Sequence, residues 1–121
     1  MASYRKERLE ELIKRIIGDL LIKGVIKDPR IGFATVVKAE LNDDRTIATV
    51  HISVIGGADE KRKTIKGLNA AAGFVKFHLG KEMQIKTIPD VNFVYDDSIE
   101  KGLGVVNLID GLAKEKTSDD E

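Results

Sequence analysis

The spacing of apolar residues changes along this chain of 121 residues, and this change of period limits the fold more than any other feature of the sequence. Between residues 9 and 21, apolar side chains recur at steps of three and four, as on one face of a helix. They are Leu9, Leu12, Ile13, Ile16, Ile17, Leu20 and Leu21. From residue 33 the period becomes two, which is typical of half-buried strands. A helix followed by strands indicates an α+β domain.

Two alternating runs separated by a turn predict a hairpin. In the first run, the alternating positions are Thr35, Val37, Ala39 and Leu41 on one side and Val36, Lys38 and Glu40 on the other. In the second run, the residues expected to face inward are Ala48, Val50, Ile52 and Val54. Those expected to face outward are Ile47, Thr49, His51 and Ser53. Residues 42–45 supply turn formers between the runs.

A second helical stretch begins near Asp59 and contains an internal conflict. Its apolar stripe consists of Ile65, Leu68, Ala72, Val75 and Leu79, and the same helical wheel places Phe74 and Phe77 on the solvent side. A break near Gly73 removes the conflict, because glycine weakens a helix interior by up to about 1 kcal/mol and permits unusual backbone geometry. We therefore expect two helices that meet at residues 70–73.

A third alternating run at residues 91–95 follows Pro89 and predicts a last strand. The expected order is helix, strand, strand, helix, kink, helix, strand, with a three-stranded sheet and helices on one face. Residues 1–97 would form one domain. Residues 98–112 could form a weak amphipathic helix capped by Ser98, and the polar tail 113–121 is expected to be disordered.

The net charge is zero, with 20 basic and 20 acidic residues, but the charge is unevenly distributed. Residues 1–38 hold nine basic and five acidic residues, and residues 59–88 hold seven and three, so each segment carries +4. Residues 39–58 carry −2 and residues 89–121 carry −6. Clustered lysine and arginine are the electrostatic footprint of a phosphate-binding surface, although lysines also solvate exposed helix faces.

Few residues suggest catalysis or metal binding. The absence of cysteine excludes disulfides, thiolate nucleophiles and cysteine-ligated metals. His51 and His78 are interpreted as surface histidines, and the pairs Asp43-Asp44 and Asp96-Asp97 as turn or cap residues that could in principle hold Mg²⁺. We expect no catalytic residues, no metal and no cofactor. No apolar run reaches the roughly 20 residues that span a bilayer, so we expect a cytoplasmic protein without membrane or small-molecule partners.

Five short segments together form a recognisable pattern. They are residues 27–30 (KDPR), 48–54 (ATVHISV), 68–76 (LNAAAGFVK), 79–81 (LGK) and 89–98 (PDVNFVYDDS). By the order and spacing of these segments, the chain resembles the bacterial ribosome-binding factor A family from its first helix to about residue 112. This resemblance implies a type II KH-like domain, in which a helix-kink-helix with an Ala-x-Gly signature replaces the usual glycine loop. Ala71 and Gly73 match that signature.

The resemblance also implies a function. Members of the family bind the free 30S small subunit and assist late 16S rRNA maturation, including processing of its 5′ end, particularly in the cold. The family has no known catalytic residues. We expect this chain to act as a monomer, with an assembly GTPase as a further partner. Lys76 stands where the family leads us to expect arginine, which keeps the charge but loses bidentate phosphate contact.

These considerations together predict an RNA-binding surface. Its expected residues are Arg5, Lys6, Arg8, Lys61, Arg62, Lys63, Lys66, Lys76, Lys81 and Lys86. With four Phe, two Tyr and no Trp, aromatic stacking is not expected to be the main binding device. One alternative is a protein-interaction module that pairs through a sheet edge or the C-terminal segment. Another is a Mg²⁺-dependent hydrolase that uses Asp96 and Asp97.

Overall fold

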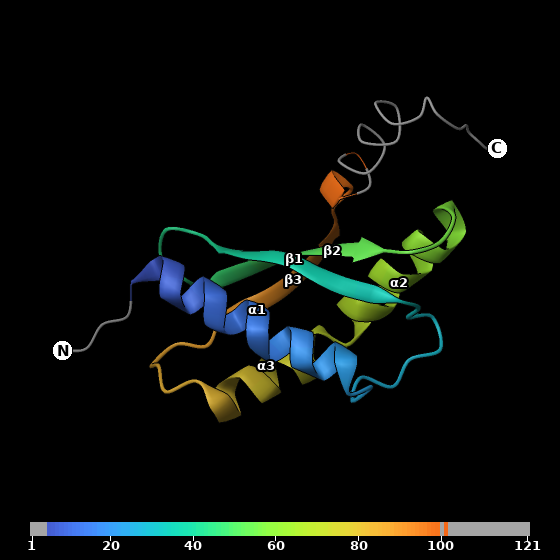
Figure 1. The fold of residues 1–121 in the computed structure, drawn as a ribbon. Helices are drawn as coiled ribbons and strands as arrows, with labels where there is room; N and C mark the ends of the chain where they lie inside the picture. Colours follow the sequence, from blue (N-terminus) through green and yellow to red (C-terminus); the bar gives the residue numbers. More distant parts are fainter. Residues whose placement is uncertain (1–4, 100, 102–121) are drawn as a thin grey trace.

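Three helices and three strands make up the part of the chain that the computed structural model describes, residues 5–99 and 101. Figure 1 shows their arrangement. In chain order they are α1 (Lys6–Ile22), β1 (Ala34–Leu41), β2 (Ile47–Val54), α2 (Ala58–Ala70), α3 (Ala72–Glu82) and β3 (Asp90–Tyr95). This order confirms the predicted α+β fold.

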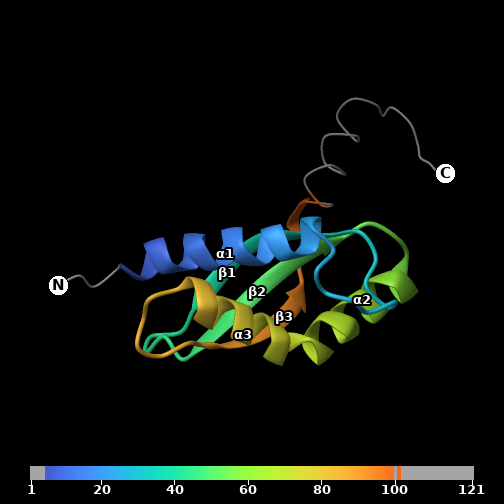
Figure 2. The same ribbon diagram turned by 90° about the horizontal axis from the view of Figure 1, so that it is seen from below.

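The strands form a single sheet in the order β1-β2-β3. The pair β1 and β2 is the predicted antiparallel hairpin, whereas β3 lies parallel to β2. A parallel pair cannot be closed by a tight turn, so the chain must cross the sheet between β2 and β3. The helix pair α2 and α3 makes this crossing beneath the sheet (Figure 2).

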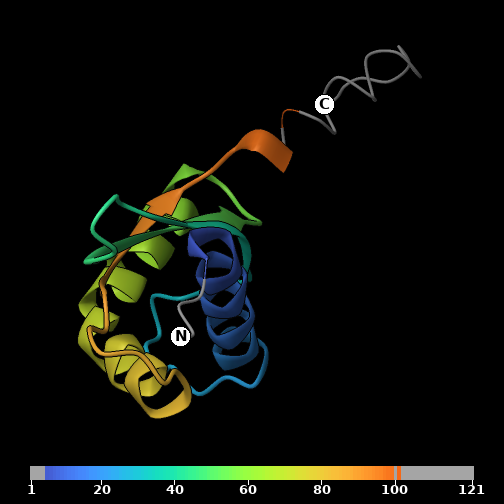
Figure 3. The same ribbon diagram turned by 90° about the vertical axis from the view of Figure 1, so that its left-hand side faces the viewer.

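All three helices lie on the same face of the sheet, as predicted (Figure 3). Helix α1 packs on β1, and α2 and α3 pack on β3. The core between the layers is mainly aliphatic, and the predicted stripe of α1 supplies five buried residues, Leu9, Ile13, Ile16, Ile17 and Leu20. Every predicted inward residue of β2 is also buried. Among the described residues, no helix has the length and apolar content that crossing a membrane requires.

The first strand departs from the predicted alternation because it contains a β-bulge. Val36 pairs with Ile52 and Lys38 with His51, so Val37 is an extra residue between two consecutive pairs. An extra residue reverses the side-chain phase. As a result Val36 is buried together with Ala39 and Leu41, whereas Thr35 is exposed and Val37 only half-buried.

The kink falls within the predicted region but not at the predicted residue. Ala71 separates the two helices, with φ −95° and ψ 8°, and its N–H donates to the carbonyl oxygens of Gly67 and Leu68. Gly73 lies inside α3. Because helical geometry resumes after one residue, Val75 and Leu79 stay in the core while Phe74 and Phe77 remain 42% and 61% exposed. The expectation that the break removes the Phe conflict is therefore wrong.

The loop before β1 is held against α2 at two positions. Thr64 is completely buried, and its Oγ1 accepts a hydrogen bond from the Gly32 N–H at 3.1 Å. A Cβ on Gly67 would lie only 3.0 Å from Ile31 Cγ1, so glycine permits the close approach of loop and helix. Within the loop, hydrogen bonds from the Arg30 side chain and backbone lower the pKa of Asp28 to about 2.

Helix side chains bind both outer edges of the sheet. On β1, Glu10 Oε2 accepts a hydrogen bond from the Leu41 N–H at 2.7 Å. On β3, the Asn69 amide accepts from the Phe93 N–H at 2.8 Å and donates to the Phe93 carbonyl oxygen at 3.0 Å. Asn69 thus replaces a neighbouring strand at this position and fixes the end of α2 to β3.

After β3 the chain enters a helical turn that includes Ser98, Ile99 and Lys101. Ser98 is the expected cap, but it lies inside the turn, and its N–H donates to Asp96 Oδ1 at 2.8 Å. The rest of the predicted segment 98–112, and the whole tail 113–121, lie outside the described residues.

Removing the Asn69 amide should destabilise the domain. Asn69→Ala leaves the N–H and C=O of Phe93 without their partner, and we expect the free energy of unfolding to fall by about 1–2 kcal/mol in urea denaturation followed by circular dichroism. Asn92→Ala is the matched control, because Asn92 is exposed on the same strand and should change stability by less than about 0.5 kcal/mol. Equal effects of the two substitutions would contradict the role of Asn69.

Candidate nucleic-acid interface

The exposed face of α2 is basic because its opposite face is committed to the core. Thr64, Gly67 and Leu68 are buried, so the helix turns Arg62, Lys63 and Lys66 to solvent. Arg62 Nη2 lies 2.7 Å from Asp59 Oδ1 in an exposed ion pair. Among the described residues, neither Lys63 nor Lys66 pairs with a carboxylate. Both ammonium groups are available to an external anion.

A hollow of about 550 Å³ lies where this face meets the end of β3. It is lined by Lys61, Arg62, Ile65, Lys66 and Tyr95. The Lys61 Nζ lies 5.1 Å from the centroid of the Tyr95 ring, a cation–π distance. Ile65 and Tyr95 are half-buried and provide apolar surface between the cationic side chains. Apolar surface bordered by cations suits a nucleotide, whose base is flat and whose phosphate is anionic.

Sequence reasoning missed the contribution of Ile65 and Tyr95. Ile65 was assigned to the apolar stripe of its helix and Tyr95 to the last strand, and both assignments are correct. Only the crossing of α2 over β3 brings the two residues together. The signal available in the sequence was an aromatic residue, Tyr95, at the end of the last alternating run.

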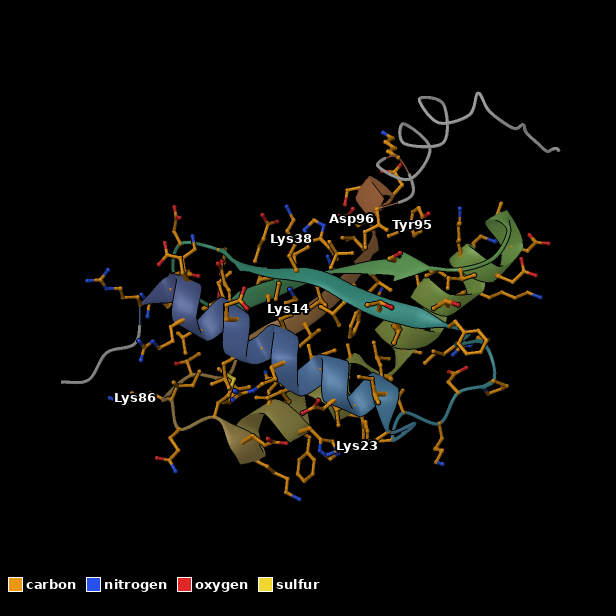
Figure 4. All side chains as sticks on the ribbon, in the orientation of Figure 1. Lys14, Lys23, Lys38, Lys86, Tyr95 and Asp96 are labelled. Atoms are coloured by element: carbon orange, nitrogen blue, oxygen red, sulfur yellow. The ribbon has the colours of Figure 1, made fainter. Side chains whose placement is uncertain are left out.

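The other predicted basic residues do not join this hollow. Figure 4 shows Lys86 at the end of the domain where α1 begins, away from Tyr95. Arg5 and Lys6 begin α1 at the same end, and Lys6 Nζ lies 4.0 Å from Asp43 Oδ1. Arg8 lines a separate groove between α1 and β1. The structure thus divides the predicted surface between two ends of the domain.

Helix α3 carries the two remaining predicted residues between these ends. Lys76 Nζ lies 2.8 Å from Asp90 Oδ1 at the start of β3, so this side chain ties α3 to the sheet. Lys81 Nζ lies 5.3 Å from the centroid of the Phe77 ring. Lys76 would have to leave Asp90 to contact a phosphate, whereas Lys81 is exposed on the outer side of α3.

On the opposite face of the sheet, His51 joins two carboxylates. Its Nε2 lies 2.8 Å from Glu40 Oε1 and its Nδ1 lies 3.0 Å from Asp96 Oδ2. The hydrogen bond from His51 is the main cause that lowers the pKa of Glu40. Hydrogen bonds from Ser98 lower the pKa of Asp96, and the charge of His51 adds to the effect. Figure 4 shows Asp96 and Lys38 on this outer side.

The carboxylates considered for Mg²⁺ are engaged elsewhere. Asp96 binds His51 and Ser98, and Asp97 Oδ2 lies 3.5 Å from Lys101 Nζ. Asp44 accepts a hydrogen bond from the Thr46 hydroxyl at 2.6 Å. Within residues 5–99 and 101, no group of three or more histidine or carboxylate side chains is arranged to hold a metal ion.

The fold and the hollow define a class of protein. A sheet whose last two strands are parallel and joined by a kinked helix pair, with helices on one face, is a KH-like α+β domain. Its basic helix borders an apolar hollow at an edge strand, an arrangement suited to nucleic acid.

The chain belongs to the ribosome-binding factor A family, whose sequence model matches residues 5–109. The ribosome-binding factor A of Geotalea uraniireducens is 38% identical over 117 residues, which cover 97% of this chain and 95% of the relative. The solution NMR structure of a Thermotoga maritima protein named as a candidate ribosome-binding factor A is 30% identical, with a TM-score of 0.68. That match covers 83% of this chain and 94% of the other.

A further set of coordinates shares the fold. It is a homology model of the Thermus thermophilus ribosome-binding factor A, fitted into the cryo-EM map of a 30S complex of that factor, with a TM-score of 0.64 at 19% identity. The match covers 77% of this chain and 97% of the Thermus chain. The identity is low, so this likeness supports the fold alone.

Substituting His51 should change one carboxyl pKa more than its neighbours. In His51→Ala we expect the pKa of Glu40 to rise toward its ordinary value, while the pKa of Asp44, lowered mainly by Thr46, stays in place. Carboxyl ¹³C NMR titration of both proteins measures these values. Because the pKa of Glu40 is lower in the folded than in the unfolded protein, its ionised carboxylate stabilises the fold at pH values above the unfolded-state pKa. This stabilisation is lost as the pH falls through the lowered pKa of the folded protein. An unchanged Glu40 titration would contradict the observed contact.

Proposed function

We propose that this protein is a ribosome assembly factor that binds the free 30S subunit through 16S rRNA and assists its late maturation, including processing of the 5′ end. The observation that carries the proposal is the hollow at Tyr95, bordered by Lys61, Arg62 and Lys66. Membership of the ribosome-binding factor A family supports the choice of ribosomal RNA over other polyanions. The Thermus protein bears the name of the same family and is fitted into the map of a 30S complex, so shared family membership supports the choice of the small subunit as the partner.

In this mechanism, phosphate contacts give position and most of the affinity. Arg62, Lys63 and Lys66 lie within two turns of α2, so they can follow one stretch of RNA backbone. The hollow at Tyr95 accepts an unpaired base beside that backbone. Ribosomal RNA in the immature subunit offers unpaired strands, which proteins recognise by stacking and by shape.

The protein acts by binding alone in this proposal. Holding or reshaping an rRNA segment lets nucleases and other factors act on it, and requires neither catalytic residues, a metal nor a cofactor from this chain. The factor would work as a cytoplasmic monomer, with particular importance in the cold, until an assembly GTPase displaces it. Residues 1–97 would form the RNA-binding domain, with the predicted contacts at Arg5, Lys6, Arg8, Lys76, Lys81 and Lys86 at the margins of the interface.

A second candidate function is protein binding at the edge of β1. A groove of about 810 Å³ runs between α1 and β1, and its apolar lining includes Leu12, Leu21, Ile22 and Val36. The occupant would be an extended peptide that adds a strand to β1. Glu10 already binds the Leu41 N–H, so only the first part of this edge is open to such pairing.

Reversing two charges on α2 should weaken association with small subunits. For Lys63→Glu with Lys66→Glu, we expect at least tenfold weaker co-sedimentation with immature 30S subunits at low salt and fixed magnesium concentration. The slope of log affinity against log salt should also become shallower by about 1.5 to 2, because fewer phosphates are neutralised. Lys38→Glu with Lys101→Glu is the matched control, because it reverses two exposed charges on β1 and in the turn after β3, outside α1, α2 and α3. Unchanged affinity of the α2 variant, with an intact circular dichroism spectrum, would remove this surface from the interface.

The groove at β1 can be tested independently. Ile22 is 84% exposed, so Ile22→Asp should leave the fold intact and, if rRNA binding is the function, leave subunit association and its salt dependence unchanged. Loss of subunit binding in Ile22→Asp, together with weak salt dependence in the wild type, would favour the protein-binding function instead.

A further inference from the structure

Helix α3 is apolar on two faces, and only one of them is covered within the described residues. Val75 and Leu79 are fully buried against the sheet. On the outer side, Phe74 is 42% exposed and Phe77 is 61% exposed. Burying large apolar rings is a main source of folding energy, so two adjacent exposed rings on one helix suggest an external partner.

The two rings form a cluster with His78, here called the aromatic patch (Phe74, Phe77 and His78). The His78 ring lies edge-to-face against both phenylalanines, with centroid distances of 4.5 Å to Phe74 and 5.9 Å to Phe77. Lys81 Nζ lies 5.3 Å from the Phe77 centroid and adds a cation at the border. The patch is therefore a set of mutually supported rings with a positive charge beside it.

Gly73 lies next to this patch without any role in the fold that requires glycine. It lies inside α3 with a negative φ, and a Cβ placed on it would meet nothing within 4 Å. Glycine in a helix interior is destabilising relative to alanine. Glycine at this exposed position leaves the backbone of α3 uncovered beside the aromatic patch.

A second glycine flanks Phe77 on its other side. Gly73 precedes Phe77 by four residues and Gly80 follows it by three, so both are its neighbours on the helix surface. A Cβ on Gly80 would meet only Ile88 Cγ1, at an ordinary 3.6 Å. Neither glycine supplies a side chain beside the Phe77 ring. Lys81 Nζ lies over one face of the ring, so a flat group can approach the other face.

The charges around the patch identify the kind of partner. Exposed residues continue from Lys66 through Ala70 and Gly73 to Phe77 and Lys81, at steps of three and four across the kink. A cation therefore stands at each end of a path of small and aromatic residues. An apolar protein surface would desolvate these cations without compensation, whereas a nucleic-acid strand offers phosphates to the cations and bases to the rings.

We propose that the aromatic patch on α3 stacks unpaired bases of an RNA strand, whose backbone passes over Gly73 between Lys66 and Lys81. This inference rests on the proposed binding of rRNA and adds a second base-binding surface to the hollow at Tyr95. It also changes the interpretation of Gly73: the kink is formed at Ala71, and glycine at 73 gives the RNA a close approach to the helix.

The test uses the full chain and two synthetic RNA probes of about 12 nucleotides, one with ordinary bases and one abasic, with the same backbone charge. For Phe77→Ala and for Phe74→Ala we expect affinity for the ordinary strand to fall about 5- to 150-fold, the range measured for loss of one stacked base. Affinity for the abasic strand should be unchanged. Phe33→Ala is the matched control, because Phe33 is 81% exposed elsewhere on the domain.

Gly73→Ala separates binding from stability. Alanine favours the helix, so the thermal midpoint should rise, while affinity for the ordinary strand should fall because the added methyl group occupies the approach to Phe77. A protein that is more stable but binds less cannot have lost affinity through unfolding. Raised stability with unchanged affinity would overturn the role proposed for Gly73.

The outcomes distinguish this inference from the proposed function. The stacking inference alone is overturned by the following result. Binding to 30S subunits weakens in Lys63→Glu with Lys66→Glu, but both Phe variants keep their binding to subunits and their affinity for the ordinary strand. Equal losses for the ordinary and abasic strands also overturn it. If the wild type does not bind subunits, the proposed function is overturned. If it then still binds the ordinary strand more tightly than the abasic one, and the Phe variants lose this difference, the stacking surface is supported.

Discussion

The parallel pairing of β2 with β3 is the constraint on which the rest of this structure depends. Parallel neighbours need a crossover, and here the crossover is the kinked pair of α2 and α3. The Asn69 amide joins the end of α2 to the backbone of Phe93, which holds this crossover against the open edge of the sheet. The hollow at Tyr95 and the aromatic patch both depend on that placement.

The side chains that the crossover exposes are those that remain after its other residues are buried in the core or against the loop before β1. Thr64 and Gly67 hold the loop before β1, and Leu68, Val75 and Leu79 enter the core. The remaining surface is basic on α2 and aromatic on α3, with Lys81 at the far end. The crossover thus provides cations, apolar surface and a path of small and aromatic residues, the features that the proposed contact with RNA requires.

Local sequence rules succeeded where a residue's surroundings follow from its own segment. The stripe of α1 and the alternation of β2 are such cases, because each has a regular period and one buried face. The rules failed at Val37, where an extra residue reverses the phase of β1. They also failed at Gly73, because the helices separate at Ala71 and Gly73 lies inside α3. For the site, the basic cluster of α2 was predicted, but Ile65 and Tyr95 were not.

The sequence by itself determined the order of elements, the core residues of α1 and β2, and the segments that carry positive charge, because hydrophobic period and charge are properties of neighbouring residues. Tertiary structure alone decided that β3 pairs with β2, that Tyr95 meets α2, and that Arg5 and Lys86 lie apart from Lys66. It also decided that Phe74 and Phe77 stay exposed. These relations join residues far apart in the chain, and only packing of the crossover against the sheet brings them together or separates them.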